Sequence, residues 1–415
     1  MKRNVCAAMA FALFLITAGA GAGQQLVIWS QPYSQQAEEE IDSIIADYNK
    51  ANPGVTVIYE RRSNNDHKVA LRVAASGKKG PDIYQMWGGL GLGGEFVNAG
   101  FSAPLNKYYD EYGWDDELLT ASLSDSRRYR GDERHGVPFR VNAQGLYYNK
   151  RLFEKAGVTK IPETYDELVE VCEKLKAAKI PAITFGGSVN WFLMRLVDVL
   201  LEKNCGAADH DKLIAMELDW STHPGVLKTF EELELWSDNY ILKPFMGMGA
   251  DQSRTLFYNG RAAMQLESDA QIPRIQANAD INDFDFFLFP TGTNRLYFYA
   301  ELWYVNENSR MKDQAAKFID YFVSRDIQQR LIGKLGIVSV NTSVTYGGAG
   351  DLPISAKWRE AYAAHNQTFP NGDQGFPLDV CMEYFRVINA VASDKMAPAE
   401  AGRQMQIFIE NNKRK

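Results

Sequence analysis

Two carboxyl groups, those of Glu267 and Asp269, stand two residues apart where a predicted strand, Gly260 to Ser268, comes to its end. Residues two apart on a strand point to the same face, so these groups could lie together, and Glu301 is a further possible partner for Glu267. Paired carboxyl groups are what a glycoside hydrolase uses. Nothing in the sequence identifies an acid with a raised pKa or a catalytic barrel. An exported glycoside hydrolase stays an alternative, and we predict no catalytic residue and no enzyme.

Other patterns that could carry chemistry are weak. The histidines show no metal-ligand spacing, and no G-x-S-x-G elbow is present, so we predict no metal site and no cofactor. Gly89, Gly91 and Gly94 fit the G-x-G-x-x-G pattern of dinucleotide sites, with Asp110 about twenty residues further on. The match follows the third predicted strand instead of the first and lies in a glycine-rich stretch, so we reject it. The five histidines are His67, His135, His210, His223 and His365.

The cysteines allow limited cross-linking. After removal of an N-terminal signal segment the chain keeps Cys172, Cys205 and Cys381, an odd number that permits at most one disulfide. A bridge between Cys172 and Cys205 is one interpretation in an oxidising compartment, and small buried thiols are the other.

The elements that must position any site begin with alternating strands and helices. Strands are predicted at residues 25–29, 55–59 and 81–86, with an amphipathic helix at 35–49 and a second helix that ends at Gly77. This alternation predicts a largely parallel sheet covered by helices on both faces. Ligands of such sheets bind in the loops after the strands. The rule indicates Gln31, Tyr33 and Trp87.

Further along, long strands are predicted to cross between two lobes. The first is Gly136 to Phe153, the second is Leu296 to Asn306, and a third crossing is expected in the Pro/Gly-rich stretch Gly347 to Pro353. Between the first two, a capping box at Thr164 and Glu167 opens a helix. A strand is predicted at Ile180 to Phe185, an apolar helix at Trp191 to Leu201, a helix at Arg254 to Asn259 and a strand at Phe284 to Pro290. After the second crossing, helices are predicted around residues 313–324, 327–333, 378–393 and 398–411.

Composition and charge narrow the class of protein. The 415 residues are 46% hydrophobic and 12% aromatic, which is ordinary for a globular protein and suggests two or three domains. The net charge is -7, and outside the C-terminal tail no basic run is longer than two residues, so we do not expect nucleic acid as a partner.

The N-terminus predicts the compartment. Lys2 and Arg3 precede an apolar run, Ala7 to Ile16, and small residues around Ala20 and Ala22 suit a signal peptidase. The run is too short for a membrane-spanning helix. We therefore predict a signal peptide at residues 1–22 and a soluble protein in the periplasm.

Taken in chain order, several sequence segments resemble those of the family 1 extracellular solute-binding proteins of ABC importers, which include the maltodextrin binders. The segments that carry the resemblance are Leu26-Val-Ile-Trp29, Tyr48-Asn-Lys-Ala-Asn-Pro-Gly54, Ala75-Ser-Gly77 with Gly80-Pro-Asp82, Val137-Pro138 with Gly145-Leu-Tyr-Tyr-Asn-Lys150, Phe153-Glu-Lys-Ala-Gly157, Phe257-Tyr-Asn-Gly260 with Ala262-Ala-Met264, and Ala315-Ala-Lys-Phe318.

The resemblance implies the α/β, two-lobed periplasmic-binding-protein type II fold. Each lobe would be a mixed, mainly parallel sheet flanked by helices, and hinge strands would join the lobes. The expected N-terminal lobe is 23–139 plus 298–346, and the expected C-terminal lobe is 140–297 plus 347–415. The chain departs from the family pattern at Glu267-Ser-Asp269 and Glu301-Leu-Trp303, where glycine, aromatic or small residues are usual.

The resemblance also implies a carbohydrate in the cleft between the lobes, delivered to the transmembrane subunits of an ABC permease by a monomeric protein. A sugar needs flat aromatic faces for its C–H groups and polar groups for its hydroxyls. The alternative partner is a membrane receptor that senses the sugar. Arg140 would suggest an acidic group if it faces the cleft. The predicted ligand-binding residues are Gln31, Tyr33, Asp66, Trp87, Arg140, Asn142, Trp191, Asp269, Glu301 and Trp303, with Asp373 and Asp379 as weaker candidates.

Overall fold

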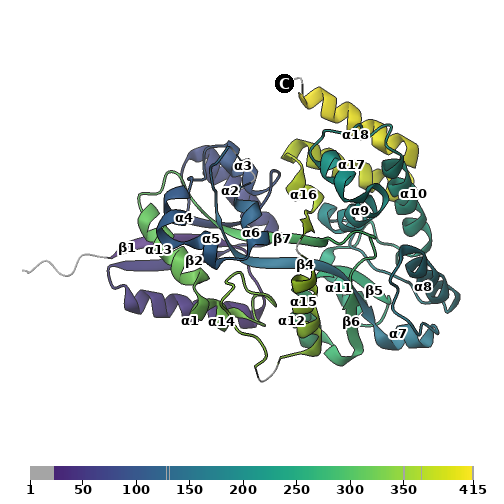
Figure 1. Ribbon diagram of the computed structural model, residues 1–415, viewed down its shortest axis with the longest axis horizontal. Helices are drawn as coiled ribbons and strands as arrows, with labels where there is room; N and C mark the ends of the chain where they lie inside the picture. Colours follow the sequence, from purple (N-terminus) through teal and green to yellow (C-terminus); the bar gives the residue numbers. More distant parts are fainter. Residues whose placement is uncertain (1–22, 128, 130, 349–350, 366, 414–415) are drawn as a thin grey trace, which may run out of the picture.

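The computed structural model describes residues 23–127, 129, 131–348, 351–365 and 367–413 and forms two lobes (Figure 1). The predicted signal peptide, residues 1–22, lies outside these described residues. Strands β4 and β7 run from one lobe into the other. The two-lobed type II fold expected from the sequence is therefore confirmed.

The first lobe begins with the predicted alternation of strands and helices. Helix α1 forms because its apolar residues recur on one face and become buried, and Ser34 caps its first turn by accepting a hydrogen bond from the Ala37 N–H. Helix α2 has the same kind of cap from Ser63. The elements are β1 (Gln24–Ser30), α1 (Gln35–Ala51), β2 (Val55–Arg61), α2 (Asn64–Gly77), β3 (Ile83–Trp87), α3 (Gly93–Asn98), α4 (Asn106–Tyr112), α5 (Trp114–Glu117), α6 (Thr120–Leu123) and the 3-10 turn η1 (Ser124–Arg127).

The chain then enters the second lobe through β4 (Val137–Asn149). The predicted capping box is present at the start of α8, where Thr164 and Glu167 exchange hydrogen bonds with each other's backbone. The other elements up to the return strand are α7 (Lys150–Lys155), α8 (Tyr165–Ala177), α9 (Asn190–Ile214), α10 (Pro224–Asn239), α11 (Ala250–Tyr258), β5 (Met264–Ser268), α12 (Gln271–Asn278), η2 (Ile281–Asp283) and β6 (Phe284–Phe287).

The return strand β7 (Leu296–Val305) brings the chain back to the first lobe, where two helices follow. The later helices cover the second lobe. The elements after β7 are α13 (Lys312–Val323), α14 (Arg325–Leu331), α15 (Pro353–Ala364), β8 (Thr368–Phe369), α16 (Gly372–Gly375), α17 (Leu378–Ala392) and α18 (Pro398–Lys413). The predicted third crossing, residues 347–353, includes positions 349–350, which lie outside the described residues.

One sheet extends through both lobes in the order β2-β1-β3-β7-β4-β5, with β6 on β4 and β8 on β7. β1 pairs parallel with β2 and β3, whereas β7 pairs antiparallel with β3 and β4. In the second lobe the sheet is more antiparallel than expected, because β5 and β6 both run against β4. The strand predicted at Ile180 to Phe185 is reduced to parallel bridges from Ile183 to Ile241 and Met264.

Two large hydrophobic cores lie on either side of the crossing. The first takes buried residues from 26–141 and 298–340, and the second takes them from 146–297 and 369–409. A smaller cluster packs Trp358 of α15 against Tyr147 and Phe286. The three described cysteines are free thiols, so the interpretation of a Cys172–Cys205 bridge is wrong for this structure.

The glycines of the rejected nucleotide motif have a packing role. They let the segment after β3 touch the backbone of α16, where Leu90 N–H donates to the Gln374 carbonyl at 2.7 Å. A Cβ on Gly91 would lie 2.5 Å from the Asp373 carbonyl oxygen, and one on Gly89 would lie 2.4 Å from that of Gln374. Only residues without side chains fit this contact between the first lobe and the last segment.

Candidate functional site

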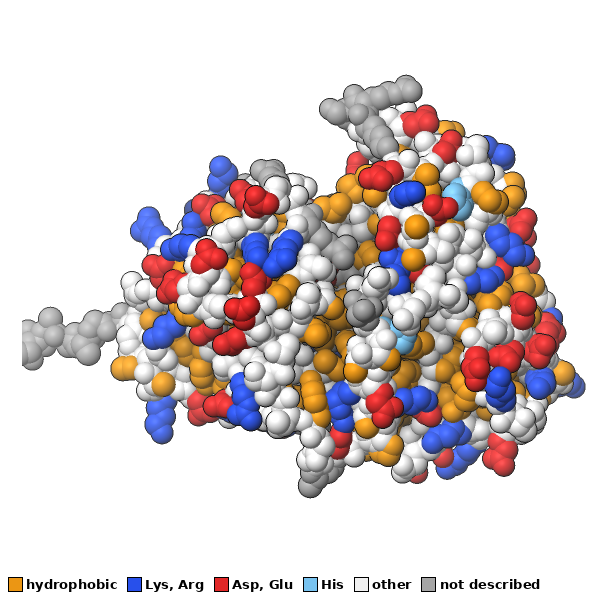
Figure 2. All heavy atoms as spheres, in the orientation of Figure 1, with side chains coloured by type: hydrophobic (Ala, Val, Ile, Leu, Met, Phe, Trp, Pro, Cys, Tyr) orange, Lys and Arg blue, Asp and Glu red, His pale blue; other side chains and the backbone are white. Residues whose placement is uncertain are grey.

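A pocket of about 480 Å³ lies between the lobes, over β4 and β7. The space-filling view also shows the molecule hollowed between its two halves, while charges of both signs are mixed over the outer face (Figure 2). The volume is within the roughly 300–1,000 Å³ of small-molecule sites. Residues of both lobes line the pocket, so a ligand in it would touch both.

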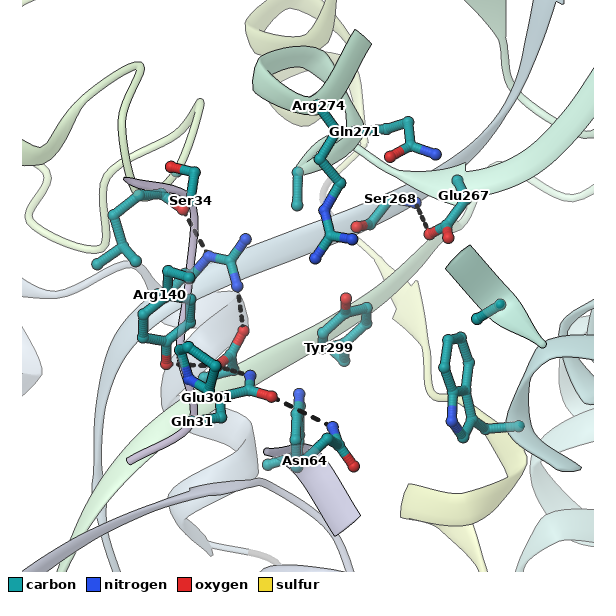
Figure 3. A pocket seen from close by; sticks show the side chains of 18 of the residues that line it. Gln31, Ser34, Asn64, Arg140, Glu267, Ser268, Gln271, Arg274, Tyr299 and Glu301 are labelled. Carbon is teal, nitrogen blue, oxygen red and sulfur yellow. Dashed lines mark hydrogen bonds and ion pairs between the residues drawn. The ribbon is translucent and has the colours of Figure 1, made fainter. Parts of the chain in front are cut away.

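Glu301 of β7 is the centre of the first-lobe wall (Figure 3). Its Oε2 accepts hydrogen bonds from Gln31 Nε2 at 3.3 Å, Tyr33 OH at 2.9 Å and Gln85 Nε2 at 3.1 Å. Its Oε1 accepts from the Arg140 guanidinium and from Asn142 Nδ2. Glu301 is 1% exposed, so its main task is to hold the loop after β1 against the crossing strands.

Arg140 of β4 lies beside Glu301 and also lines the pocket. Burial would lower the pKa of Arg140, but the neighbouring Glu301 carboxylate raises it above the usual value. The guanidinium also lies 5.2 Å from the Tyr33 ring centre, and Nε donates to the Leu335 carbonyl at 2.6 Å. Two of the five N–H donors of Arg140 are used by Glu301 and the Leu335 carbonyl, so this cation has a structural role in the hinge.

The second-lobe wall is built around Glu267 of β5. The Glu267 carboxylate lies 2.6 Å from both Arg195 of α9 and Arg254 of α11. Burial alone would raise the pKa of Glu267, but these two guanidinium groups hold it at about 2. Glu267 is therefore an ionised partner for arginines and lacks the raised pKa of a general acid.

Two tryptophans face the pocket from opposite lobes. Trp87 ends β3, and Trp191 lies in the first turn of α9; both are partly exposed. Lys68 lies 4.9 Å from the Trp87 ring centre, and Arg195 lies 4.7 Å from that of Trp191. Tyr299 of β7 lies on the pocket floor between the walls (Figure 3). Aromatic groups on both walls suit a ligand with two apolar faces.

Several buried acceptors at the pocket lack a hydrogen-bond partner among the described residues. They are Asn64 Oδ1, Asn371 Oδ1 and Asp373 Oδ1. Buried acceptors normally find donors, so these oxygens are suited to hydroxyl groups of a ligand.

Six of the ten predicted residues line the pocket, and four do not. The six are Gln31, Tyr33, Trp87, Arg140, Trp191 and Glu301. Trp303 is fully buried against Phe139, 4.2 Å between ring centres, because it lies two residues deeper along β7 than Glu301. Asn142 is buried and binds Glu301. Neither side chain is among the residues that line the pocket, although both were predicted to bind ligand.

The remaining two of these four are Asp66 and Asp269. Asp66 is exposed and accepts from Ser63 Oγ in the cap of α2. Asp269 is buried and accepts from Tyr362 OH at 2.9 Å, and burial raises its pKa to about 7. Among the weaker candidates, Asp373 lines the pocket, whereas Asp379 lies on a separate groove with Leu90 and Met382. Asp269 and Glu267 therefore do not face a common cavity.

The sequence did not single out the arginines of the second-lobe wall. Arg195, Arg254 and Arg274 come from three different helices, and only the fold brings them together. Arg274 lies in the first turn of α12, and Arg254 and Arg195 lie one turn into α11 and α9. These positions were a usable signal, because helix starts face the ligand side of such sheets. Tyr299 could have been found from its position two residues before Glu301 on β7.

No helix in the described part of the chain is long and apolar enough to cross a membrane. No group of three or more histidine, cysteine, aspartate or glutamate side chains in the same residues is arranged to hold a metal ion.

Comparisons with known proteins agree with this architecture. A family model described as bacterial extracellular solute-binding protein matches residues 31–329. Brucella abortus has a binding protein that is 26% identical over 258 residues, or 60% of each chain, so the match spans well under two thirds of that relative. A maltotriose-binding protein of Pyrococcus abyssi is 26% identical over 78% of this chain and 68% of its own.

A solved structure of a chitin oligosaccharide binding protein superposes with a TM-score of 0.84. The alignment covers 94% of this chain and 98% of the other at 22% identity, which establishes similarity of fold.

Proposed function

Because this chain belongs to the bacterial extracellular solute-binding proteins, we propose that it captures a carbohydrate, from one to several rings long, between its lobes for an ABC importer. The observation that carries the proposal is the pair of tryptophans, Trp87 and Trp191, that face one pocket from opposite lobes. Pyranose rings present C–H faces to aromatic rings and hydroxyl groups to polar side chains. The unpartnered oxygens of Asn64 and Asn371 are available for those hydroxyls.

The mechanism we propose is closure of the lobes on the ligand. A sugar that touches both walls binds the closed arrangement more strongly than the open one, and it shifts the population by that difference. The crossing strands β4 and β7 would absorb the rotation. The closed protein would then dock on the transmembrane subunits of a permease. The matched relatives include proteins named for binding sugars, which supports this choice of ligand.

We propose a signal peptide at residues 1–22, a soluble periplasmic monomer, and lobe boundaries at 139/140, 297/298 and 346/347. The separate hydrophobic cores support these boundaries. We also propose that the protein is not an enzyme, since Glu267 is held ionised by arginines and Asp269 lies behind the wall.

A thermal-shift panel of mono-, di- and oligosaccharides on the mature protein tests the function. A ligand at 100 times its Kd adds about 2.7 kcal/mol of stability, which raises the melting temperature by about 3 °C in a chain of 415 residues. Chromatography of the released ligand then separates the alternatives. Intact sugar supports capture, and cleaved sugar supports a glycoside hydrolase. If no sugar shifts the melt, the carbohydrate proposal fails. Capture of a receptor instead of a permease by the loaded protein would favour sensing.

A further inference from the structure

The second-lobe wall of the pocket carries more positive than negative charge. Arg195 and Arg254 share the single carboxylate of Glu267, each at 2.6 Å. Asp251 lies 2.9 Å from Arg254 and 3.7 Å from Arg274, but its side chain is 91% exposed. Solvent and salt screen an exposed carboxylate strongly. The three guanidinium groups are thus opposed by one buried and one screened carboxylate.

Arg274 is the cation that this arrangement leaves least compensated. Its side chain reaches from α12 into the pocket, between Arg140 and Glu267 (Figure 3). Asp251 is its ion-pair partner among the described residues. Burial lowers the pKa of Arg274, and the positive charge of Arg254 lowers it further. Arg274 and Arg254 are therefore like charges held near each other at the pocket, and the counter-ion that they share, Asp251, is exposed to solvent.

Each remaining cation of the pocket wall lies near a carboxylate that balances its charge. Arg140 forms an ion pair with Glu301 and Lys334 forms one with Glu40. The opposite charges of Lys68 and Asp373 lie near enough to affect each other's pKa. The net charge of the whole chain is -7, so a positive excess at this wall is not a general property of the protein. The excess is local, and it is located where a ligand would contact the second lobe.

Three helices also begin at this wall. α9, α11 and α12 start next to Val189, Gly249 and Ala270, and none of these N-cap residues makes a side-chain capping hydrogen bond. Helix starts present free N–H groups and a partial positive charge. Their orientation adds to the potential of the arginines and favours an anion at the same place.

We infer that the pocket takes an acidic carbohydrate, a sugar bearing a carboxylate or a phosphate, and that this anionic group lies against Arg274 and Arg254. The inference rests on the proposed function, since it names the class of sugar that the same pocket binds. A guanidinium group can bind either anion through two parallel N–H donors. Such an anion would neutralise the positive excess, whereas a neutral sugar would leave it uncompensated and partly desolvated.

Calorimetric titration of the mature full chain with four matched ligands tests the inference. The ligands are a short uronate oligosaccharide, its methyl ester, the neutral oligosaccharide with the same linkage, and the 6-phosphate of that neutral sugar. We expect the uronate or the phosphate to bind about tenfold or more tightly than the ester and the neutral sugar. The stronger of the two names the anion. Its advantage should shrink as the salt concentration rises.

The substitution Arg274→Gln provides the matched variant. Because the Arg274 side chain is half exposed, we expect the variant to stay folded, and a melting curve checks this directly. We expect Arg274→Gln to weaken the acidic ligand by about ten- to a hundredfold and the neutral sugar by less than about threefold. Arg274→Lys keeps the positive charge but lacks the planar guanidinium with its paired N–H donors. Its affinity for the acidic ligand should lie between those of the wild type and Arg274→Gln. The control Arg386→Gln removes an exposed arginine of the same lobe and should change neither affinity.

The outcomes separate this inference from the proposed function. If neutral and acidic sugars bind equally, or if Arg274→Gln weakens both alike, the acidic class is overturned while carbohydrate capture stands. If none of the four ligands binds the wild-type protein, carbohydrate capture itself fails and takes the inference with it.

Discussion

Replacing Glu301 with glutamine removes the negative charge that pairs with Arg140 in the hinge. The Glu301 side chain is 1% exposed and that of Arg140 is 10% exposed, so the variant leaves a buried cation without its partner. The glutamine amide replaces one of the two accepting oxygens with an NH2 group. That NH2 group would face either the three donors that bind Oε2 or the two that bind Oε1. We therefore expect Glu301→Gln to destabilise the protein strongly.

The size of the effect follows from the burial. Breaking a buried ion pair on one side costs about 3–5 kcal/mol. The entropy of unfolding near the melting temperature is roughly 0.9 kcal/mol per degree for 415 residues. The expected fall in melting temperature is therefore about 3 to 6 °C. Scanning calorimetry of the mature protein measures it.

Two further variants make the measurement specific. Glu163→Gln breaks an exposed contact to Lys160 and should melt within about 1 °C of the wild type. Arg140→Gln combined with Glu301→Gln removes both charges, and it should melt above Glu301→Gln alone. The reasoning is refuted if Glu301→Gln melts within 1 °C of the wild type, or if the double variant is the less stable of the two.

Three other outcomes are expected. The pKa of Glu267 is about 2 in the folded protein and 4.5 ordinarily. Its ionisation therefore contributes stability above pH 4.5 that is lost as the pH falls toward 2. In melts taken across this range, the difference in stability between wild type and Glu267→Gln should disappear at the acid end. Trp191→Ala should weaken the sugar found by thermal shift about 30-fold in calorimetric titration, since a buried tryptophan anchor is worth about 2 kcal/mol or more. Gly91→Ala forces a Cβ against the Asp373 carbonyl, so small-angle scattering should find the lobes further apart and denaturant melts should find the protein about 1–3 kcal/mol less stable.

Each of these has a control and a contrary result. If the difference in stability between wild type and Glu267→Gln stays constant from pH 5 to pH 2, the prediction for Glu267 is contradicted. Trp29→Ala is the control for Trp191→Ala, and it should leave sugar affinity unchanged because Trp29 lies away from the pocket. Gly54→Ala is the control for the third, because a Cβ there meets nothing within 4 Å. An unchanged scattering profile for Gly91→Ala would show that the contact with α16 does not set the distance between the lobes.

The sequence was sufficient for the elements that depend on local pattern. α1 and α8 were predictable because apolar spacing and capping residues act within a few positions. The strand expected at Ile180 to Phe185 kept only isolated bridges, because strand length depends on neighbours that are far away in the chain. Residues after β1 and β3 were found at the pocket by the rule for parallel sheets.

The polar site was harder to predict because it depends on depth and on partners. Trp303 shares its strand face with Glu301 but lies two residues further along β7, inside the core. The alternation of side chains along a strand predicts the face on which a residue lies, but not how far it lies from the pocket. Arg195, Arg254 and Arg274 are separated by up to 79 positions, so only the packing of three helices reveals them as one cluster. The helix starts indicate where each arginine lies, but only the tertiary structure shows that the three meet on one wall.

The position of β7 in the sheet has a consequence for synthesis of the chain. β7 lies between β3 and β4, which do not pair with each other, so the first lobe lacks a central strand until Val305 has been made, about three quarters of the way along the chain. Contacts of such long sequence separation form slowly. A nascent chain that cannot complete its first lobe early stays unfolded for longer, and such a delay would suit the export proposed for this protein.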